Sequence, residues 1–280
     1  MFAGPQGDVR HLGPRVRSSV DRHHNGKGVT TMYDPADVLG RINEPYVPLL
    51  FFTLVGWTTG FVQIVQAFRL GRRDSIPAAP IGMTAFLLAH DGSFALQAQY
   101  WLCDIGNWYF TAFWAGMVVS VVIELMLVRQ FLVYGQPGIA PDLPRWMFVG
   151  SYLVLQAFAF VGLWWMQSVL DDPLHLISLV ATQIVATVFL VPWILTRGNA
   201  RGQSRAFAWA TLLGPGGLGL GLFPALSPSA FNNWHYYALV VSLISLSVTY
   251  LLLLERHLRR SSATPRALGR RQPDSGGKRH

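Results

Sequence analysis

The stretch Pro80–Trp101, PIGMTAFLLAHDGSFALQAQYW, decides how the rest of the chain is interpreted. Its length fits a transmembrane helix, because about 20 helical residues cross the roughly 30 Å of hydrocarbon in a bilayer. Asp91 lies at its middle, with His90 beside it. A carboxyl group at that depth is costly, so such groups usually face the interior of a helix bundle or a cavity. The stretch therefore predicts a membrane helix with a polar inner face.

The composition of the 280 residues is that of a membrane protein. Hydrophobic residues make up 51% of the chain and charged residues only 13%, and the mean hydropathy is +0.34. Soluble domains carry about 25% charged residues. The formal charge of +8 comes from arginines in the two tails and in alternate loops. That distribution indicates membrane topology, and we expect no nucleic-acid partner.

Seven apolar segments predict an all-α bundle of seven transmembrane helices over residues 47–255. They are Val47–Phe68, Pro80–Trp101, Gly106–Val133, Trp146–Gln167, Leu174–Leu195, Ala206–Leu226 and His235–Leu254. Residues 1–46 are expected to form a basic, disordered tail followed by a short helix at the membrane surface within Met32–Tyr46. Asp34 can cap that helix, whose apolar face would carry Val38, Leu39 and Ile42. Residues 256–280 are expected to be a second disordered basic tail.

The arginines alternate between loops and so predict the orientation of the bundle. Three loops carry them, as Arg69, Arg72 and Arg73, then Arg129 and Arg145, then Arg197, Arg201 and Arg205. The other three loops contain no Lys or Arg. The positive-inside rule then places the N-terminus outside and the C-terminus in the cytoplasm of a multi-pass protein of the cell membrane. The basic residues within 1–31 conflict with this orientation, and a natural start at Met32 would remove the conflict. No cleavable signal peptide is recognisable.

Two acids inside apolar segments are the candidate catalytic residues, Asp91 and Glu124. Burial disfavours the charged form of an acid, so Asp91 could stay neutral and donate a proton at neutral pH. The alternative is that His90 and Asp91 are a structural polar pair between helices. Glu124 precedes Arg129 by five residues, so an ion pair near the cytoplasmic edge is an equal alternative for it. The short loop between their two segments makes the helices expected neighbours.

Several other motifs have structural explanations. The run Gly214–Gly221, GPGGLGLG, lacks the strand and the acid of a dinucleotide site, and it predicts close helix packing or a break in the sixth segment. The only lysines, Lys27 and Lys278, lie in the tails, which excludes a retinal Schiff base. Trp114, Trp164 and Trp165 suit an interfacial belt or a cation-stabilising cavity. No metal-ligand spacing or cofactor motif is present, so we expect neither a metal nor a cofactor.

The region over residues 47–135 resembles the small seven-helix membrane terpene cyclases of meroterpenoid and indole-diterpenoid pathways, the paspaline and pyripyropene cyclase type. The matching features are Gly56-Trp57, Pro80 before an acid at Asp91, and Glu124 followed by Gly135. The family carries Glu at the first acid position and Asp at the second, whereas this chain carries Asp91 at the first and Glu124 at the second. Where the family has a Trp and an Asn before the first acid, this chain has His90 and Leu87. In the last helix Tyr250 matches, but the family's acids are replaced by Ile244 and Ser247.

The resemblance implies an isomerase- or lyase-type enzyme that protonates an epoxide or alkene of a hydrophobic prenylated substrate and steers the cyclisation of the cation. Asp91 would be the acid, and Glu124 would orient it or accept the final proton. His90, Trp57, Trp114 and Tyr250 would contact the substrate. A small seven-helix transporter and a non-catalytic membrane subunit are the alternatives. A transporter would favour two similar halves, which the sequence does not show.

Overall fold

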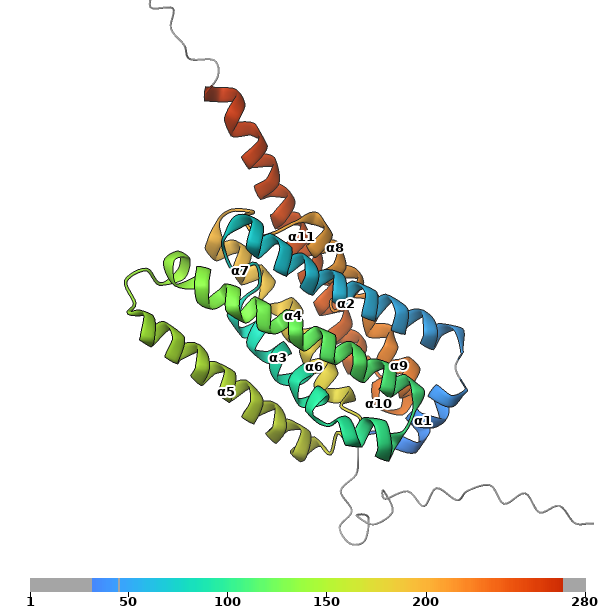
Figure 1. The fold of residues 1–280 in the computed structure, drawn as a ribbon. Helices are drawn as coiled ribbons and strands as arrows, with labels where there is room; N and C mark the ends of the chain where they lie inside the picture. Colours follow the sequence, from blue (N-terminus) through green and yellow to red (C-terminus); the bar gives the residue numbers. More distant parts are fainter. Residues whose placement is uncertain (1–31, 45, 269–280) are drawn as a thin grey trace, which may run out of the picture.

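A computed structural model of the chain describes residues 32–44 and 46–268, so the tails predicted over 1–31 and 269–280 lie outside the described part. Its helices form one elongated bundle (Figure 1), and the described residues contain no strand, as an all-α protein requires. The elements are α1 (Pro35–Asn43), α2 (Val47–Asp74), α3 (Ile81–Leu96), the π-helix η2 (Tyr100–Ile105), α4 (Trp108–Ile139), α5 (Arg145–Leu170), α6 (Leu176–Val188), α7 (Leu190–Arg197), α8 (Arg205–Leu213), the 3₁₀ helix η3 (Leu218–Gly221), α9 (Leu222–Leu226), α10 (Pro228–Phe231) and α11 (Trp234–Leu268).

Six helical segments of the described chain are long and apolar enough to cross a bilayer. They are Val47–Asp74, Trp108–Ile139, Arg145–Leu170, Leu176–Arg197, Arg205–Leu226 and Trp234–Ser261. In five of them most side chains are not fully buried, and many of the exposed ones are large and apolar, whereas Arg205–Leu226 is 67% buried. Such a surface is unfavourable in water and suits lipid. The fold is therefore that of a helical protein that could pass the membrane several times.

The helix that carries Asp91 is shorter than predicted. The apolar segment Pro80–Trp101 forms α3 over 16 residues only, and the chain then continues into η2. Gly106 ends η2 in the left-handed conformation, at φ +59°. Most of α3 is buried, because α4, α5 and α6 pack around it. Because other helices enclose α3, little of it can contact lipid. With only 16 residues α3 is also shorter than a usual transmembrane helix, so a seventh crossing stays a prediction.

Two of the predicted segments are interrupted helices. The fifth divides into α6 and α7 at Phe189, where Pro192 lacks the N–H that would bond to Val188 and its ring crowds that carbonyl. The sixth divides into α8, η3 and α9 at the glycine-rich run, which confirms the predicted break. The predicted close packing is also present, since a Cβ atom on Gly56 of α2 would lie 3.8 Å from Gly219 Cα.

The predicted short helix near the N-terminus forms as α1. Asp34 caps it, with its Oδ1 atom accepting a hydrogen bond from Ala36 N at 2.9 Å. Val38 and Ile42 are completely buried, because they pack into the protein core together with residues of α9. The apolar face of α1 therefore closes one end of the bundle, where the sequence had suggested contact with the membrane surface.

Tyr33, just before α1, fixes this closure. Its hydroxyl donates to Asp172 Oδ1 at 2.7 Å and accepts from Leu174 N at 2.8 Å. Burial and then the neighbouring Asp172 carboxylate raise the pKa of Tyr33 above its ordinary value. The hydroxyl therefore keeps its proton and joins α1 to the loop between α5 and α6.

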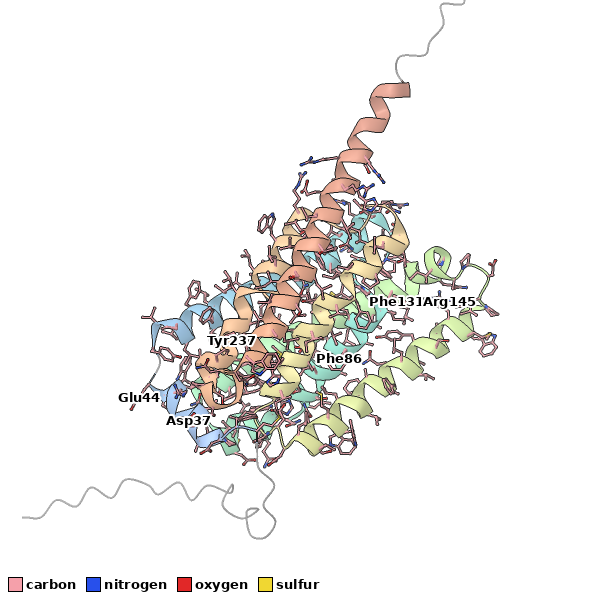
Figure 2. The ribbon with its side chains drawn as sticks, turned by 180° about the vertical axis from the view of Figure 1, so that it is seen from behind. Asp37, Glu44, Phe86, Phe131, Arg145 and Tyr237 are labelled. Atoms are coloured by element: carbon pink, nitrogen blue, oxygen red, sulfur yellow. The ribbon has the colours of Figure 1, made fainter. Side chains whose placement is uncertain are left out.

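The arginine-bearing loops gather at the opposite end of the bundle. Arg201 donates to the Asp74 carbonyl at 3.0 Å and Gly202 N donates to Asp74 Oδ2 at 2.7 Å, which joins the loop after α2 to the loop after α7. Figure 2 shows Arg145 at the end of the molecule away from Asp37 and Glu44 of α1. This separation is what the alternating charges predicted. Which membrane face each end meets stays a prediction.

Helix α11 is longer than its apolar segment. It was expected to end near Leu254, with a disordered tail from residue 256, but it is helical to Leu268 and extends beyond the bundle (Figure 1). Hydropathy marks where a helix meets lipid, and a helix can continue past that point into water. The tail prediction is therefore wrong for residues 256–268.

We expect a reporter fused after Arg260 to be cytoplasmic and a tag inserted near Asn232 to be external. The reason is that the arginine-rich end should remain on the side of synthesis. Accessibility of each tag to a membrane-impermeant label in intact cells measures the orientation. Both tags on one side would mean that α11, which lies between them, does not cross the membrane.

Candidate functional site

The two predicted acids lie together at the centre of the bundle. Asp91 of α3 and Glu124 of α4 are 7% and 1% exposed, and both line the same hollow. Ser120 Oγ, one turn before Glu124, donates to Glu124 Oε1 at 3.4 Å, whereas Glu124 Oε2 has no other partner among the described residues. Two buried carboxylates side by side repel each other strongly, and one proton held between them removes that repulsion. The alternative of an ion pair between Glu124 and Arg129 is not present.

His90 supports Asp91 through a hydrogen bond between their side chains. Its Nδ1 atom lies 2.8 Å from Asp91 Oδ1, and the ring is completely buried. This bond fixes the Asp91 side chain, as the second group in many catalytic pairs does. His90 was predicted to contact substrate, but it is not among the residues that line the cavity described next. Its position suits a residue that orients Asp91.

A second histidine covers the outer side of His90. The ring centroids of His90 and His175 are 6.3 Å apart, and Gln167 Nε2 lies 2.9 Å from His175 Nδ1. Burial, and then the neighbouring His90, lowers the pKa of His175 to about 3. His175 is therefore neutral at physiological pH and accepts the bond from Gln167.

Asp91 and Glu124 form part of the wall of an internal cavity of about 120 Å³. A single water needs roughly 10–15 Å³ of such space, so several waters or the reacting end of a longer substrate would fit, and the cavity is partly open to the outside. The other walls come from α2, α6 and the region of η3 and α9. They are mainly apolar, with Gln63, Thr182 and Gln183 as further polar members. The cavity therefore pairs a proton-carrying site with an apolar interior.

Aromatic rings face the same cavity. Trp57 lies between Tyr109 and Phe113, with ring centroids at 5.7 and 5.6 Å, and Phe61 and Phe223 complete the aromatic wall. Trp57 Nε1 has no hydrogen-bond partner among the residues that the structure describes. Ring faces within about 6 Å of a cation attract it. The prediction that Trp57 belongs to the site thus fits its place in the wall.

Two other predicted contacts lie elsewhere. Trp114 is not part of the cavity wall, and its Nε1 atom donates to the Ala95 carbonyl at 3.0 Å. Tyr250 of α11 is also outside the wall, buried against Phe207 of α8, and its hydroxyl donates to Gln203 Oε1. Ser247, where the terpene cyclases carry an acid, packs instead against Gly216. The last helix therefore contributes none of its predicted contacts to the cavity.

The glycines that make room for the cavity were missed as site residues. Gly56 and Gly60 on α2 and Gly116 on α4 all line it. A Cβ atom at Gly60 would meet nothing within 4 Å. Gly56 and Gly60 are one helical turn apart, the small-residue spacing that allows close approach between membrane helices, and this signal was present in the sequence.

Within the described residues, no three His, Cys, Asp or Glu side chains are grouped so that they could hold a metal ion. The site consists of one acid pair, one supporting histidine and an apolar, aromatic cavity. The chain matches no protein-family model, no curated protein and no solved structure, so this chemistry is the basis for the function.

Proposed function

We propose that this protein is an integral membrane enzyme of the terpene cyclase type, which cyclises a prenylated lipid by protonating an epoxide or an alkene. The observation that carries the proposal is that Asp91 and Glu124 both line an apolar, aromatic cavity. Carboxyl groups held in such surroundings keep a proton at neutral pH and can act as general acids. The resemblance over residues 47–135 supports the same chemistry.

Asp91 begins the reaction by giving its proton to the epoxide oxygen of the substrate. One carbon–oxygen bond of the epoxide breaks, and its electron pair goes to the oxygen, which becomes a hydroxyl. The carbon left behind becomes a tertiary carbocation. The electron pair of the next double bond in the chain attacks that cation, closes a ring and moves the positive charge along. Each closure converts one double bond into a single bond of the ring.

Trp57 and Phe113 favour this cascade, because their ring faces attract the moving positive charge. The last cation loses a proton to the carboxylate pair, which returns to its starting state. Substrate and product are then isomers, and the reaction needs no oxidant or reductant. His90 holds Asp91 in place during both proton transfers.

Purified protein in detergent should therefore convert a farnesylated arene that carries a terminal epoxide, without added partners. Mass spectrometry should show a product of unchanged mass, and NMR should show lost double bonds and a new hydroxyl. If the compound binds and is recovered unchanged across a panel of chain lengths, the proposal is wrong. A transporter would then be the better explanation of the cavity.

Filling the cavity from Gly60 should impair this activity. In Gly60→Leu the new side chain enters open space, so we expect the bundle to fold and kcat/KM to fall about 10- to 200-fold, the range for a few methylenes that compete with substrate. Gly162→Leu on α5 is the matched control, because Gly162 also has open space around its Cβ position but lies outside the cavity wall. Equal activity in the two variants would place the reaction outside this cavity.

A further inference from the structure

A second hollow lies on the outside of the bundle, between the C-terminal parts of α2 and α4. It is a groove of about 520 Å³, and it shares no residue with the acid-containing cavity. Arg72 and Arg129 line it together with the apolar side chains Phe68, Met126 and Val133. We propose that this groove binds an anionic phospholipid, with the headgroup phosphate between the two arginines and an acyl chain along the apolar wall.

The two guanidinium groups are available to an anion. Arg72 and Arg129 are exposed, and no carboxylate of the described residues pairs with either of them. The printed contact of Arg72 is with the Phe68 ring, at 5.8 Å from the centroid. Guanidinium groups bind phosphate oxygens with two parallel N–H donors, which makes arginine the preferred residue for this ligand. Two such groups on facing helices suit one phosphate.

The depth of the groove matches that of lipid headgroups. Trp108 opens α4, and Arg129 follows it by 21 residues, which is about 32 Å along a helix. That length equals the hydrocarbon thickness, so Arg129 reaches the far interface when Trp108 sits at the near one. Met126, about one turn nearer the membrane centre than Arg129, is 43% exposed and offers its side chain to an acyl chain. A free phosphate ion would leave this apolar wall uncovered, whereas a lipid covers it.

A buried glutamine holds the groove open. Gln130 lies between the two helices, and its Nε2 atom donates to the Phe68 carbonyl at 2.9 Å. Its Oε1 atom has no hydrogen-bond partner among the described residues, although the side chain belongs to the groove wall. Gln130 Oε1 is buried against Gly71 of α2, so this side chain braces the two helices and leaves the phosphate to the arginines. Phosphatidylglycerol carries the net negative charge that suits these arginines, and phosphatidylcholine does not.

Native mass spectrometry of the full chain, titrated with phosphatidylglycerol or phosphatidylcholine, tests the assignment. We expect the protein to bind phosphatidylglycerol more tightly than phosphatidylcholine. Arg72→Gln and Arg129→Gln should each weaken it about fivefold, and the double variant about 25-fold, because each arginine near the membrane surface contributes one charge interaction. Arg69→Gln is the matched control, because Arg69 lies on α2 like Arg72 and is exposed but does not line the groove. The affinity of this variant for phosphatidylglycerol should stay within about twofold of the wild-type value.

Two further measurements distinguish binding of a lipid from binding of a soluble anion. Met126→Trp leaves the charge unchanged but fills the apolar part of the groove on the membrane side of Arg129, so it should also weaken the binding of phosphatidylglycerol. Inorganic phosphate should compete poorly, because it has no acyl chain. Equal binding of the two lipids, an equal loss in Arg69→Gln, no effect of Met126→Trp, or full displacement by inorganic phosphate would each overturn the proposal. Circular dichroism and gel filtration check that every variant is folded.

Discussion

Asp91→Asn should fold like the wild type and lose about 10²- to 10⁴-fold in kcat, with KM little changed. Asn keeps the volume of the side chain and an oxygen that can accept from His90 Nδ1, but it has no transferable proton. The loss therefore reports proton donation and not packing. Single-turnover conversion of the epoxide substrate measures it directly, and thermal unfolding in detergent checks the fold.

The neighbouring acids provide the controls for this result. Asp104→Asn changes the same chemical group at an exposed position of η2 and should leave the activity unchanged. Glu124→Gln should lose less than Asp91→Asn, because Glu124 orients the donor or accepts the last proton. An Asp91→Asn protein with full activity would remove Asp91 as the acid, whatever Glu124 does. Full activity in both variants would leave the proposed cyclase without an acid in α3 or α4.

Gly217→Ala should be among the most destabilising single substitutions in the bundle, costing up to about 3 kcal/mol. A Cβ atom at this position would lie 2.1 Å from the carbonyl oxygen of Leu212. That oxygen belongs to the backbone at the end of α8, so the clash cannot be relieved by rotating a side chain. The turn between α8 and η3 has to move, and with it Gly219, which lines the cavity.

Gly138→Ala is the control for that substitution. A Cβ atom at Gly138 meets nothing within 4 Å, and the residue lies within α4, where Ala is favoured over Gly by about 1 kcal/mol. We expect its melting temperature in detergent to equal or exceed that of the wild type. If Gly217→Ala melts together with Gly138→Ala, the tight turn described here is not the native one.

The order of the apolar helices could be predicted from the sequence, because lipid demands long apolar segments whatever their partners. Their ends could not. Helix α2 continues to Asp74 and α4 to Ile139, well past the apolar residues, since a helix does not stop where hydropathy falls. The division of α6 from α7 was foreseeable from Pro192 but was missed. The enclosed position of α3 follows from packing against three other helices, which no local pattern encodes.

The acid pair could be predicted because an acid inside an apolar segment is conspicuous and the loop between α3 and α4 is short. The cavity wall could not, since it depends on how each helix is rotated. Phe113 faces the cavity while its neighbour Trp114 turns away and binds a backbone carbonyl, a difference of one residue or about 100° on a helix. Gly60 contributes by having no side chain, and sequence inspection aimed at functional groups overlooks such residues.

The closure of the bundle end by α1 has a consequence for how the chain is assembled. Tyr33 binds Asp172, a residue 139 positions later, and α1 packs on α9, which is made later still. At about 5–20 residues per second, the partner of Tyr33 appears roughly 7–28 s after Tyr33 itself. Helix α1, the first helix of the described residues, is thus among the last to dock. Until then the half-built bundle stands open at that end, and the interval is one in which a chaperone or a lipid can occupy the place that α1 later takes.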